Sequence, residues 1–214
     1  MITFQDDSKS IPYKKFKEKY HEAQKANQES IEAISISSFS KSRKEVSSRF
    51  VNLKFVIRND FIFFSNYQSS KSLDFSEHNQ VSALIYWNKI DTQIRMKAKI
   101  QKSPQIFSDN YFFQRSKAKN ALAISSKQSI KVDSYDQVKS AYNEVFENKD
   151  TKIRPNYWGG YSFKPYYFEF WEGHKSRLNK RDVYEVSCAC SLGLATINEP
   201  YSYSGSWNSK LPNK

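Results

Sequence analysis

The chain has 214 residues, of which 38% are hydrophobic and 16% aromatic, and this is enough for one medium-sized domain with a core of its own. Its mean hydropathy is −0.76, and no apolar run comes near the roughly 18 residues of a membrane span, which excludes a transmembrane helix. Lys and Arg outnumber Asp and Glu by 34 to 22, so the formal net charge is +12, which favours nucleic acid or small phosphorylated ligands as partners.

The N-terminal segment, residues 1–11, is polar, and we expect it to be a mobile arm. It contains neither the basic nor the apolar stretch of a secretory signal, so we expect a cytoplasmic protein. After Pro12, the aromatic residues Tyr13, Phe16 and Tyr20 recur at helical spacing among lysines and glutamates. This pattern predicts an amphipathic helix with proline in its first turn.

The middle of the chain consists mainly of β-rich segments joined by short turns. Apolar residues alternate with polar ones over residues 94–101, which predicts a strand with one face in water. Asn59 and Asp60 suit a hairpin turn between two apolar runs. The strands that we expect are 31–39, 49–58, 61–64, 81–87, 94–101, 166–171 and 181–190.

Helices are expected between these strands, at residues 69–78, 104–115, 118–125 and 134–148. Short connections between most strands favour antiparallel pairing, and no G-x-G-x-x-G follows any strand, which argues against a Rossmann sheet. We therefore predict an α+β protein built on a closed or nearly closed antiparallel barrel of about six or seven strands. One domain is expected over 12–190, with a weakly ordered tail over 191–214.

The cysteines and histidines indicate neither a disulfide framework nor a metal site. Cys188 and Cys190 are two residues apart on an expected strand, where a disulfide between them would be strained. His21, His78 and His174 show no zinc-ligand spacing. We expect no bound metal.

The C-terminal third combines aromatic, glycine and arginine residues in three short segments. They read R-P-N-Y-W-G-G-Y at 154–161, F-E-F-W-E-G at 168–173 and R-L-N-K-R at 177–181. Considered alone, W-G-G is a turn with an aromatic plug and E-F-W is the core of a strand. Two arginines flanking a polar loop after a tryptophan also suit a planar, anionic ligand.

These segments resemble the C-terminal signature of the pyridoxine/pyridoxamine 5′-phosphate oxidases, R-P-x-x-W-G-G-[YF] … E-F-W-x-G … R-L-H-D-R. Earlier segments resemble other motifs of the same family, in the same order and at the expected spacing. They are R-F-V-N-L-K at 49–54, F-S-N-Y and S-S-K within 64–71, Q-I-R at 93–95, Y-F and an arginine within 111–115, and S-K-Q-S at 126–129. The resemblance covers about residues 12–186.

The resemblance implies a homodimeric, Greek-key split β-barrel that binds FMN at the subunit interface. It implies that Arg49 and Lys71 neutralise the FMN phosphate, and that Lys54 and Gln93 bind the flavin ring. Some of the cofactor ligands would come from the partner subunit. The implied set is Arg49, Lys54, Phe64, Ser65, Ser70, Lys71, Gln93, Gln128, Ser129, Trp171 and Arg181.

The resemblance also implies a phosphorylated substrate beside the flavin. The implied substrate ligands are Lys54, Tyr111, Arg115, Lys119, Arg177 and Asn179. Arg177 and Asn179 are the implied catalytic residues, with Arg177 over the pyridine ring. The implied reaction moves a hydride from C4′ of pyridoxine or pyridoxamine 5′-phosphate to the flavin; O₂ then reoxidises the flavin, giving pyridoxal 5′-phosphate and H₂O₂.

The chain departs from the family pattern at three of these positions. Ser70 replaces an arginine, and the loss of one charge-assisted hydrogen bond, worth about 1.5–3 kcal/mol, predicts weaker FMN retention. Lys119 replaces a serine but is still able to bind a phosphate. Asn179 replaces a histidine and cannot titrate near neutral pH.

Three other functions stay open. A related split-barrel flavin oxidoreductase could act on another substrate, although Tyr111, Arg115 and Arg177 together argue against this. A non-catalytic protein could hold FMN or pyridoxal phosphate, which the changes at Ser70 and Asn179 allow. Nucleic-acid binding rests only on the net charge, since no nucleic-acid motif is present.

Overall fold

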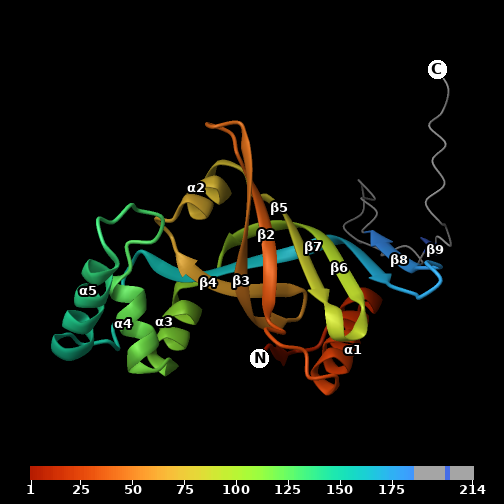
Figure 1. Cartoon of the computed structure of the whole chain (residues 1–214), viewed down its shortest axis with the longest axis horizontal. Helices are drawn as coiled ribbons and strands as arrows, with labels where there is room; N and C mark the ends of the chain where they lie inside the picture. Colours follow the sequence, from red (N-terminus) through yellow and green to blue (C-terminus); the bar gives the residue numbers. More distant parts are fainter. Residues whose placement is uncertain (186–200, 203–214) are drawn as a thin grey trace.

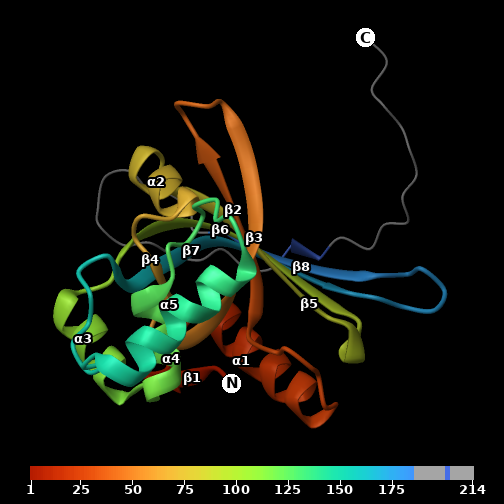
Figure 2. The same ribbon diagram turned by 60° about the vertical axis from the view of Figure 1, so that its left-hand side comes forward.

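A computed structural model describes residues 1–185 and 201–202, and Figures 1 and 2 show it from two sides. In this part of the chain, nine strands form one sheet. They are β1 (Thr3–Gln5), β2 (Ala33–Ser40), β3 (Glu45–Ile57), β4 (Asp60–Asn66), β5 (Gln80–Trp87), β6 (Thr92–Lys102), β7 (Trp158–Glu172), β8 (Lys180–Glu185) and β9 (Tyr201–Ser202). The α-helices are α1 (Ile11–Lys25), α2 (Ser70–Glu77), α3 (Gln105–Gln114), α4 (Lys117–Ser125) and α5 (Tyr135–Asn148), and a short 3-10 turn, η1, spans Asn88–Ile90.

Strands β2 to β7 close into a barrel. β2 pairs with β3 and β5, and β6 lies between β5 and β7. β4 then closes the ring, because it pairs with β3 on one side and β7 on the other. All of these pairings are antiparallel, so the predicted α+β fold with a closed antiparallel barrel is confirmed. β7 is 15 residues long, and its C-terminal half extends past β4 to pair with β8.

The interior of the barrel is filled by the inward-facing side chains of each strand. On β6, Ile94, Met96 and Ala98 are fully buried, while Arg95 and Lys97 between them are exposed, as the alternating sequence predicts. Helix α1 lies below the strands in Figure 1 and adds its aromatic face to this core. The ring of Phe16, which is also fully buried, packs edge-on against the ring of Phe61 at a centroid distance of 4.9 Å. Burying such a side chain stabilises the fold by about 1.5–3 kcal/mol.

The N-terminal residues are part of the sheet. β1 pairs in parallel with β3, with Thr3 opposite Phe55, and the side chain of Ile2 is only 6% exposed. The backbone N–H of Ile2 donates a hydrogen bond to the hydroxyl of Tyr20 over 3.0 Å. The prediction of a mobile arm over residues 1–11 is therefore wrong for 2–5, since a polar segment can still form main-chain hydrogen bonds. The domain limits at residues 12 and 190 stay a prediction.

Strand β7 begins at Trp158, well before the strand predicted at 166–171. Gly159 and Gly160 are strand residues, and their conformation is not that of a turn. A Cβ atom on Gly159 would collide with the ring of Tyr67, whose hydroxyl donates a hydrogen bond to the carbonyl of Gly160 over 3.1 Å. Glycine is therefore required because a tyrosine ring crosses the strand at this point.

Helices α3, α4 and α5 form a lobe beside the barrel, at the left in Figure 1. The lobe has a small core of its own, in which Phe112 and Ala123 pack with Trp158 of the barrel. The buried amide of Asn120 donates hydrogen bonds to the carbonyls of Phe112 and Thr151, which joins α4 to α3 and to the segment that leads into β7. The lobe is thus fixed to the barrel at the start of β7.

No helix in residues 1–185 combines the length and the apolar composition needed to cross a bilayer. The strand predicted over 181–190 is described as far as Glu185. Cys188, Cys190 and the predicted weakly ordered tail, apart from β9, lie outside the described residues.

Candidate functional site

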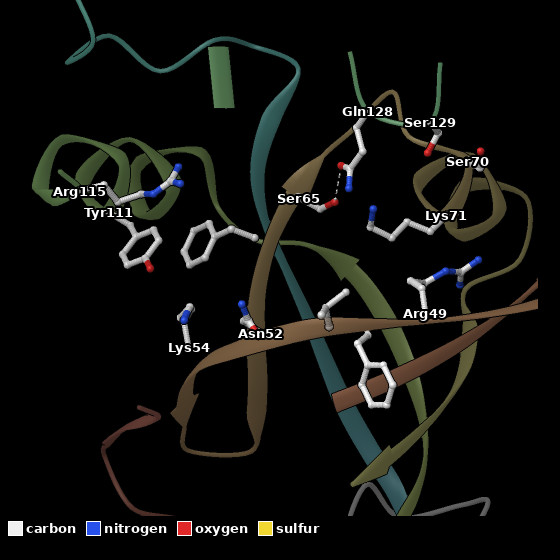
Figure 3. Close-up of a pocket in the computed structure, with 13 residues that line it drawn as sticks. Arg49, Asn52, Lys54, Ser65, Ser70, Lys71, Tyr111, Arg115, Gln128 and Ser129 are labelled. Carbon is white, nitrogen blue, oxygen red and sulfur yellow. Dashed lines mark hydrogen bonds between the residues drawn. The ribbon is translucent and has the colours of Figure 1, made fainter. Parts of the chain in front are cut away.

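A cavity of about 570 Å³ lies between β3, β4, α2 and the helical lobe (Figure 3). Its volume is typical of small-molecule sites, which range from about 300 to 1,000 Å³. The residues that line it come from five separate segments of the chain. They are Arg49, Phe50, Val51, Asn52, Lys54, Phe64, Ser65, Ser70, Lys71, Tyr111, Arg115, Gln128 and Ser129.

One end of the cavity, at the right in Figure 3, carries two cations. Lys71 lies in the first turn of α2, and although it is charged it is only 6% exposed. Burial, and then the nearby charge of Arg49, lower the pKa of Lys71 to about 8. The N-terminus of α2 adds the partial positive charge of its free N–H groups. This end therefore favours an anion of more than one charge.

Arg49 is held in this end by hydrogen bonds to the neighbouring strand. Its Nη1 donates to the hydroxyl of Ser38 over 2.7 Å and to the carbonyl of Ile36 over 3.2 Å. Its Nη2 lies 3.7 Å from a carboxylate oxygen of Asp74. The guanidinium is thus oriented before any ligand binds, which lowers the entropy cost of binding.

The opposite end of the cavity, at the left in Figure 3, carries a second cationic group formed by Lys54 and Arg115. Nη2 of Arg115 donates to the carbonyl of Lys119 over 3.0 Å. Its Nη1 is buried and has no hydrogen-bond partner among the described residues. Burial lowers the pKa of Arg115. A buried N–H without a partner is costly, so a ligand that accepts a hydrogen bond there gains affinity.

A stack of aromatic rings lies between Arg115 and the middle of the cavity. Phe64 stacks on Tyr111 at a centroid distance of 3.9 Å and on Trp158 at 5.2 Å. The rings of Phe64 and Trp158 are nearly parallel, at 10°. This wall has a flat apolar surface, which suits a planar ring in the ligand.

The middle of the cavity offers neutral hydrogen-bonding groups. The hydroxyl of Ser65, on β4, donates to the side-chain oxygen of Gln128 over 3.4 Å. Gln128 and Ser129 lie on the loop between α4 and α5, and Ser129 has a positive φ of 67°. The loop therefore brings amide and hydroxyl groups from the helical lobe to the edge of the barrel.

The structure brings most of the predicted site residues together in this cavity, but six of them lie elsewhere. Gln93, Trp171 and Arg181 are opposite one another on β6, β7 and β8. Arg177 and Asn179 lie in the turn between β7 and β8, at the side of the barrel away from the helical lobe in Figure 1. The sixth, Lys119, is exposed on α4, and its backbone carbonyl, not its ammonium group, contacts Arg115.

Arg181 is fixed by a buried carboxylate. Glu169 on β7 is 3% exposed, and its Oε1 accepts a hydrogen bond from Nη1 of Arg181 over 2.7 Å. Its Oε2 accepts from Arg95 and from the hydroxyl of Tyr167, each over 2.9 Å. Because every contact limits rotation of the carboxylate, the guanidinium of Arg181 has a defined direction on the surface of the sheet.

Phe50, Val51 and Asn52 line the cavity but were not predicted as site residues. All three lie between Arg49 and Lys54 on β3, so their position between two predicted ligands was the available signal. Phe50 is 76% exposed, which is unusual for a phenylalanine.

Comparison with known proteins gives one matching family model and three similar relatives. Residues 158–211 match the family model described as the pyridoxine 5′-phosphate oxidase C-terminal dimerisation region. A pyridoxine/pyridoxamine 5′-phosphate oxidase of Colwellia psychrerythraea is 35% identical over 181 residues, which is 83% of this chain and 82% of the relative. The corresponding oxidase 1 of Hydrogenovibrio crunogenus is 34% identical over 180 residues, 84% of this chain and 83% of the relative. The chloroplastic oxidase 1 of Arabidopsis thaliana is 34% identical over 178 residues, but this chain spans only 33% of its length.

Two solved structures have the same fold. PhzG from Burkholderia lata, solved in complex with tetrahydrophenazine-1-carboxylic acid, superposes with a TM-score of 0.80 at 23% identity and covers 92% of this chain and 93% of its own. A pyridoxamine 5′-phosphate oxidase-related, FMN binding protein from Nostoc punctiforme superposes with a TM-score of 0.70 at 12% identity, covering 92% and 98%. The predicted split β-barrel is confirmed by these similarities.

Proposed function

The chain belongs to the pyridoxine/pyridoxamine 5′-phosphate oxidase family, and on this premise we propose that it oxidises pyridoxamine 5′-phosphate and pyridoxine 5′-phosphate to pyridoxal 5′-phosphate with FMN and O₂. The observation that carries the proposal is one cavity with a cationic group at each end. Arg49 and Lys71 form one group, and Lys54 and Arg115 the other (Figure 3). Two phosphorylated ligands bound side by side need this arrangement, because each phosphate requires its own cations.

The end formed by Arg49 and Lys71 fits the phosphate of FMN. It offers two cations, the N-terminus of α2 and the hydroxyl groups of Ser70 and Ser129. Gln128 and the edge of β3 then border the space for the flavin ring. When bound, FMN supplies the hydride acceptor and passes the electrons to O₂, which becomes H₂O₂.

The end formed by Lys54 and Arg115 fits the phosphate of the substrate. The free Nη1 of Arg115 is a donor for a phosphate oxygen, and the Tyr111 hydroxyl is a second. Phosphate binding at this end directs the pyridine ring toward the middle of the cavity, where C4′ would face the flavin. The amine substrate with O₂ and water gives the aldehyde, ammonia and H₂O₂; the alcohol substrate with O₂ gives the aldehyde and H₂O₂.

We assign Gln93, Trp171 and Arg181, together with Arg177 and Asn179, to the cavity of a second copy of the chain. None of them lines the cavity of its own subunit, and residues 158–211 match a dimerisation region. The same sheet also exposes apolar side chains that a partner would cover, among them Val46 at 70% and Phe50 at 76%. The proposed enzyme is therefore a homodimer with two shared sites.

The reaction is tested by loading the protein with FMN and adding pyridoxamine 5′-phosphate without air. We expect the visible absorption of the oxidised flavin to bleach and to return when O₂ is admitted, with one aldehyde and one H₂O₂ per turnover. Pyridoxamine without its phosphate is the matched control and should bleach the flavin much more slowly. Flavin that stays oxidised with both phosphorylated substrates would show a binding protein or an oxidase of another substrate.

A further inference from the structure

A buried carboxylate lies directly behind the FMN-phosphate end of the cavity. Asp74, on α2, is 1% exposed and does not line the cavity. One of its oxygens accepts a hydrogen bond from Nη2 of Arg43 over 2.7 Å. The other accepts from the hydroxyl of Ser38 over 2.7 Å and lies 3.7 Å from Nη2 of Arg49. Asp74 thus lies between an arginine of the cavity and an arginine outside it.

The charges around Asp74 decide how much positive potential reaches the cavity. With only Arg49 and Lys71 as cations, the carboxylate would cancel one of them and leave a net charge of about +1 against a phosphate of about −2. Arg43 adds a third cation, so these three cations and Asp74 leave a net of about +2. A second carboxylate, that of Glu45, lies 3.6 Å from Nε of Arg43, but it is 66% exposed and its charge is therefore screened by water more than that of the buried Asp74. Ser70, at the N-terminus of α2, lines the cavity but contributes only a hydroxyl group.

Arg43 is held in place by the turn that carries it. The turn joins β2 to β3 and lies against α2, where both the backbone N–H and the hydroxyl of Ser42 donate to the carboxylate of Glu77, over 3.1 and 2.7 Å. Asp74 and Glu77 are three residues apart on the same face of α2, so the turn has two anchors on the helix. The helix that presents Lys71 at one end is therefore bound to the Arg43 turn along its length.

Electrostatic coupling between the two arginines is consistent with this geometry. Burial lowers the pKa of Arg49, Asp74 raises it, and Arg43 lowers it. Arg43 and Arg49 therefore repel each other directly, and the carboxylate of Asp74, which lies between them, attracts both. The side chain of Arg43 is 44% exposed, so its charge stays partly hydrated while it pairs with the buried Asp74.

We propose that Arg43 is a positioning residue for the FMN phosphate: by pairing with Asp74, it leaves the charges of Arg49 and Lys71 available to the ligand and supplies the cation that Ser70 does not. Arg43 itself does not touch the ligand. The inference rests on the proposed FMN site, because it concerns the phosphate end of that cavity. It predicts that Arg43 matters for FMN but not for riboflavin, which has the same ring and no phosphate.

The test is a titration of the flavin-free protein with FMN and with riboflavin, followed by quenching of flavin fluorescence. Arg43→Gln should weaken FMN binding about tenfold, as expected for the loss of one charge-assisted interaction, and leave riboflavin binding unchanged. Arg58→Gln is the matched control, since Arg58 is 77% exposed and its one ion pair within the described part of the chain is with Asp6 at the surface. This control should bind both flavins like the wild type.

A second variant separates charge from structure. In Arg43→Gln/Asp74→Asn, both the cation and the carboxylate are lost, so the net charge near the phosphate returns to about +2 and FMN affinity should recover. Arg43→Gln/Ser70→Arg should also recover it, because a cation is added directly at the cavity. Arg43→Gln alone leaves the buried carboxylate of Asp74 without its closest cation, which can prevent folding. The double variant Arg43→Gln/Asp74→Asn has no buried carboxylate at this position, so we expect it to fold even where the single variant does not.

The outcomes distinguish this inference from the proposed function. Wild-type protein that binds FMN no more tightly than riboflavin would contradict the phosphate site itself. Wild-type protein that prefers FMN, with no change in Arg43→Gln, would overturn the role of Arg43 alone. Two results would show that Arg43 acts only through the structure of the turn. One is an equal loss of affinity for FMN and riboflavin in Arg43→Gln; the other is an FMN affinity of Arg43→Gln/Asp74→Asn that stays as low as that of Arg43→Gln.

Discussion

The guanidinium carbon of Arg115 lies 4.4 Å from the ring centroid of Trp158, which holds the arginine against the aromatic wall of the cavity. The flat face of the guanidinium packs on the ring, so this cation–π contact uses none of the N–H donors of Arg115. Nη2 is satisfied by a backbone carbonyl, and Nη1 is left buried without a partner in the described residues. The arginine is thus fixed in direction while one donor stays free for a ligand.

Replacement of Arg115 should affect the substrate and not the cofactor. Arg115→Gln removes the free donor and the charge at the substrate-phosphate end, so we expect KM for pyridoxamine 5′-phosphate to rise about 10- to 100-fold. FMN affinity should stay within about twofold, since we assign the FMN phosphate to the other end of the cavity. Steady-state kinetics at saturating FMN measure the first effect, and flavin titration the second. Lys139→Gln, at an exposed ion pair on α5, is the control. A parallel loss of FMN affinity would contradict the assignment of the two ends.

FMN binding should weaken above pH 8. Burial and then Arg49 lower the pKa of Lys71 to about 8 in the free protein, and a dianionic phosphate binds the protonated form better. Above pH 8, binding must therefore be accompanied by proton uptake, and FMN affinity should fall as pH rises. FMN affinity is measured by fluorescence titrations at pH values from roughly 6.5 to 9.5, which cover both sides of the lowered pKa. Lys71→Arg keeps its charge over the whole range, so its affinity should be independent of pH there. The same pH dependence in Lys71→Arg would assign the effect to another group.

The stability of the flavin-free protein should change with pH in the opposite direction. The pKa of Lys71 is about 8 when folded and 10.5 for an ordinary lysine, so between these values the unfolded chain binds more protons. The free energy of unfolding should therefore rise as pH increases from 8 toward 10.5, by the contribution of this one group. Urea denaturation at several pH values, compared with Lys71→Met, isolates it. A wild-type curve parallel to that of Lys71→Met would contradict the lowered pKa.

Replacement by alanine should lower the stability of the protein more at Gly159 than at Gly173. A Cβ on Gly159 meets the Tyr67 hydroxyl and ring, which are packed against the barrel, so Gly159→Ala should cost about 1–3 kcal/mol. A Cβ on Gly173 meets the carboxylate of Asp91, which is exposed and can move away. Thermal denaturation of both variants should show a clearly larger fall in Tm for Gly159→Ala. Equal falls would mean that Tyr67 moves as easily as an exposed side chain.

Two inactive variants should restore activity when they share a dimer. Arg49→Ala disables the cavity group and Arg181→Ala the group assigned to the partner, so each homodimer should be inactive. A mixed dimer has one intact site out of two, so the purified mixed dimer should have about half of the wild-type activity. Co-expression with two affinity tags and an assay of the mixed dimer measure this. Mixing Arg49→Ala with Lys71→Ala, which lie in the same group, should restore nothing. Failure of the first pair would place Arg181 outside the site.

Local patterns in the sequence were sufficient for most of the individual elements, although not for β1 or for the start of β7. The alternation of Ile94, Met96 and Ala98 with charged residues predicts β6, because a strand that covers a core must bury every second side chain. The order of the motifs also predicted most of the cavity, since Arg49 and Lys54 share one strand and Lys71 begins the next helix. Motif spacing carries this information because neighbouring strands and helices keep their side chains at fixed positions.

Other features are set only by contacts between distant segments. β1 joins the sheet through main-chain hydrogen bonds, which no side-chain pattern encodes. β7 begins at Trp158 and continues through two glycines, and the first of them is required because the ring of Tyr67 crosses the strand there. The sequence alone contained the residue types for the site and for the strands. The closed barrel decided the rest, because pairing β4 with both β3 and β7 determines which cations face one another, which donor of Arg115 is buried, and that Arg43 meets Asp74. Burial and charge pairing depend on distances through space, and a linear pattern does not specify these distances.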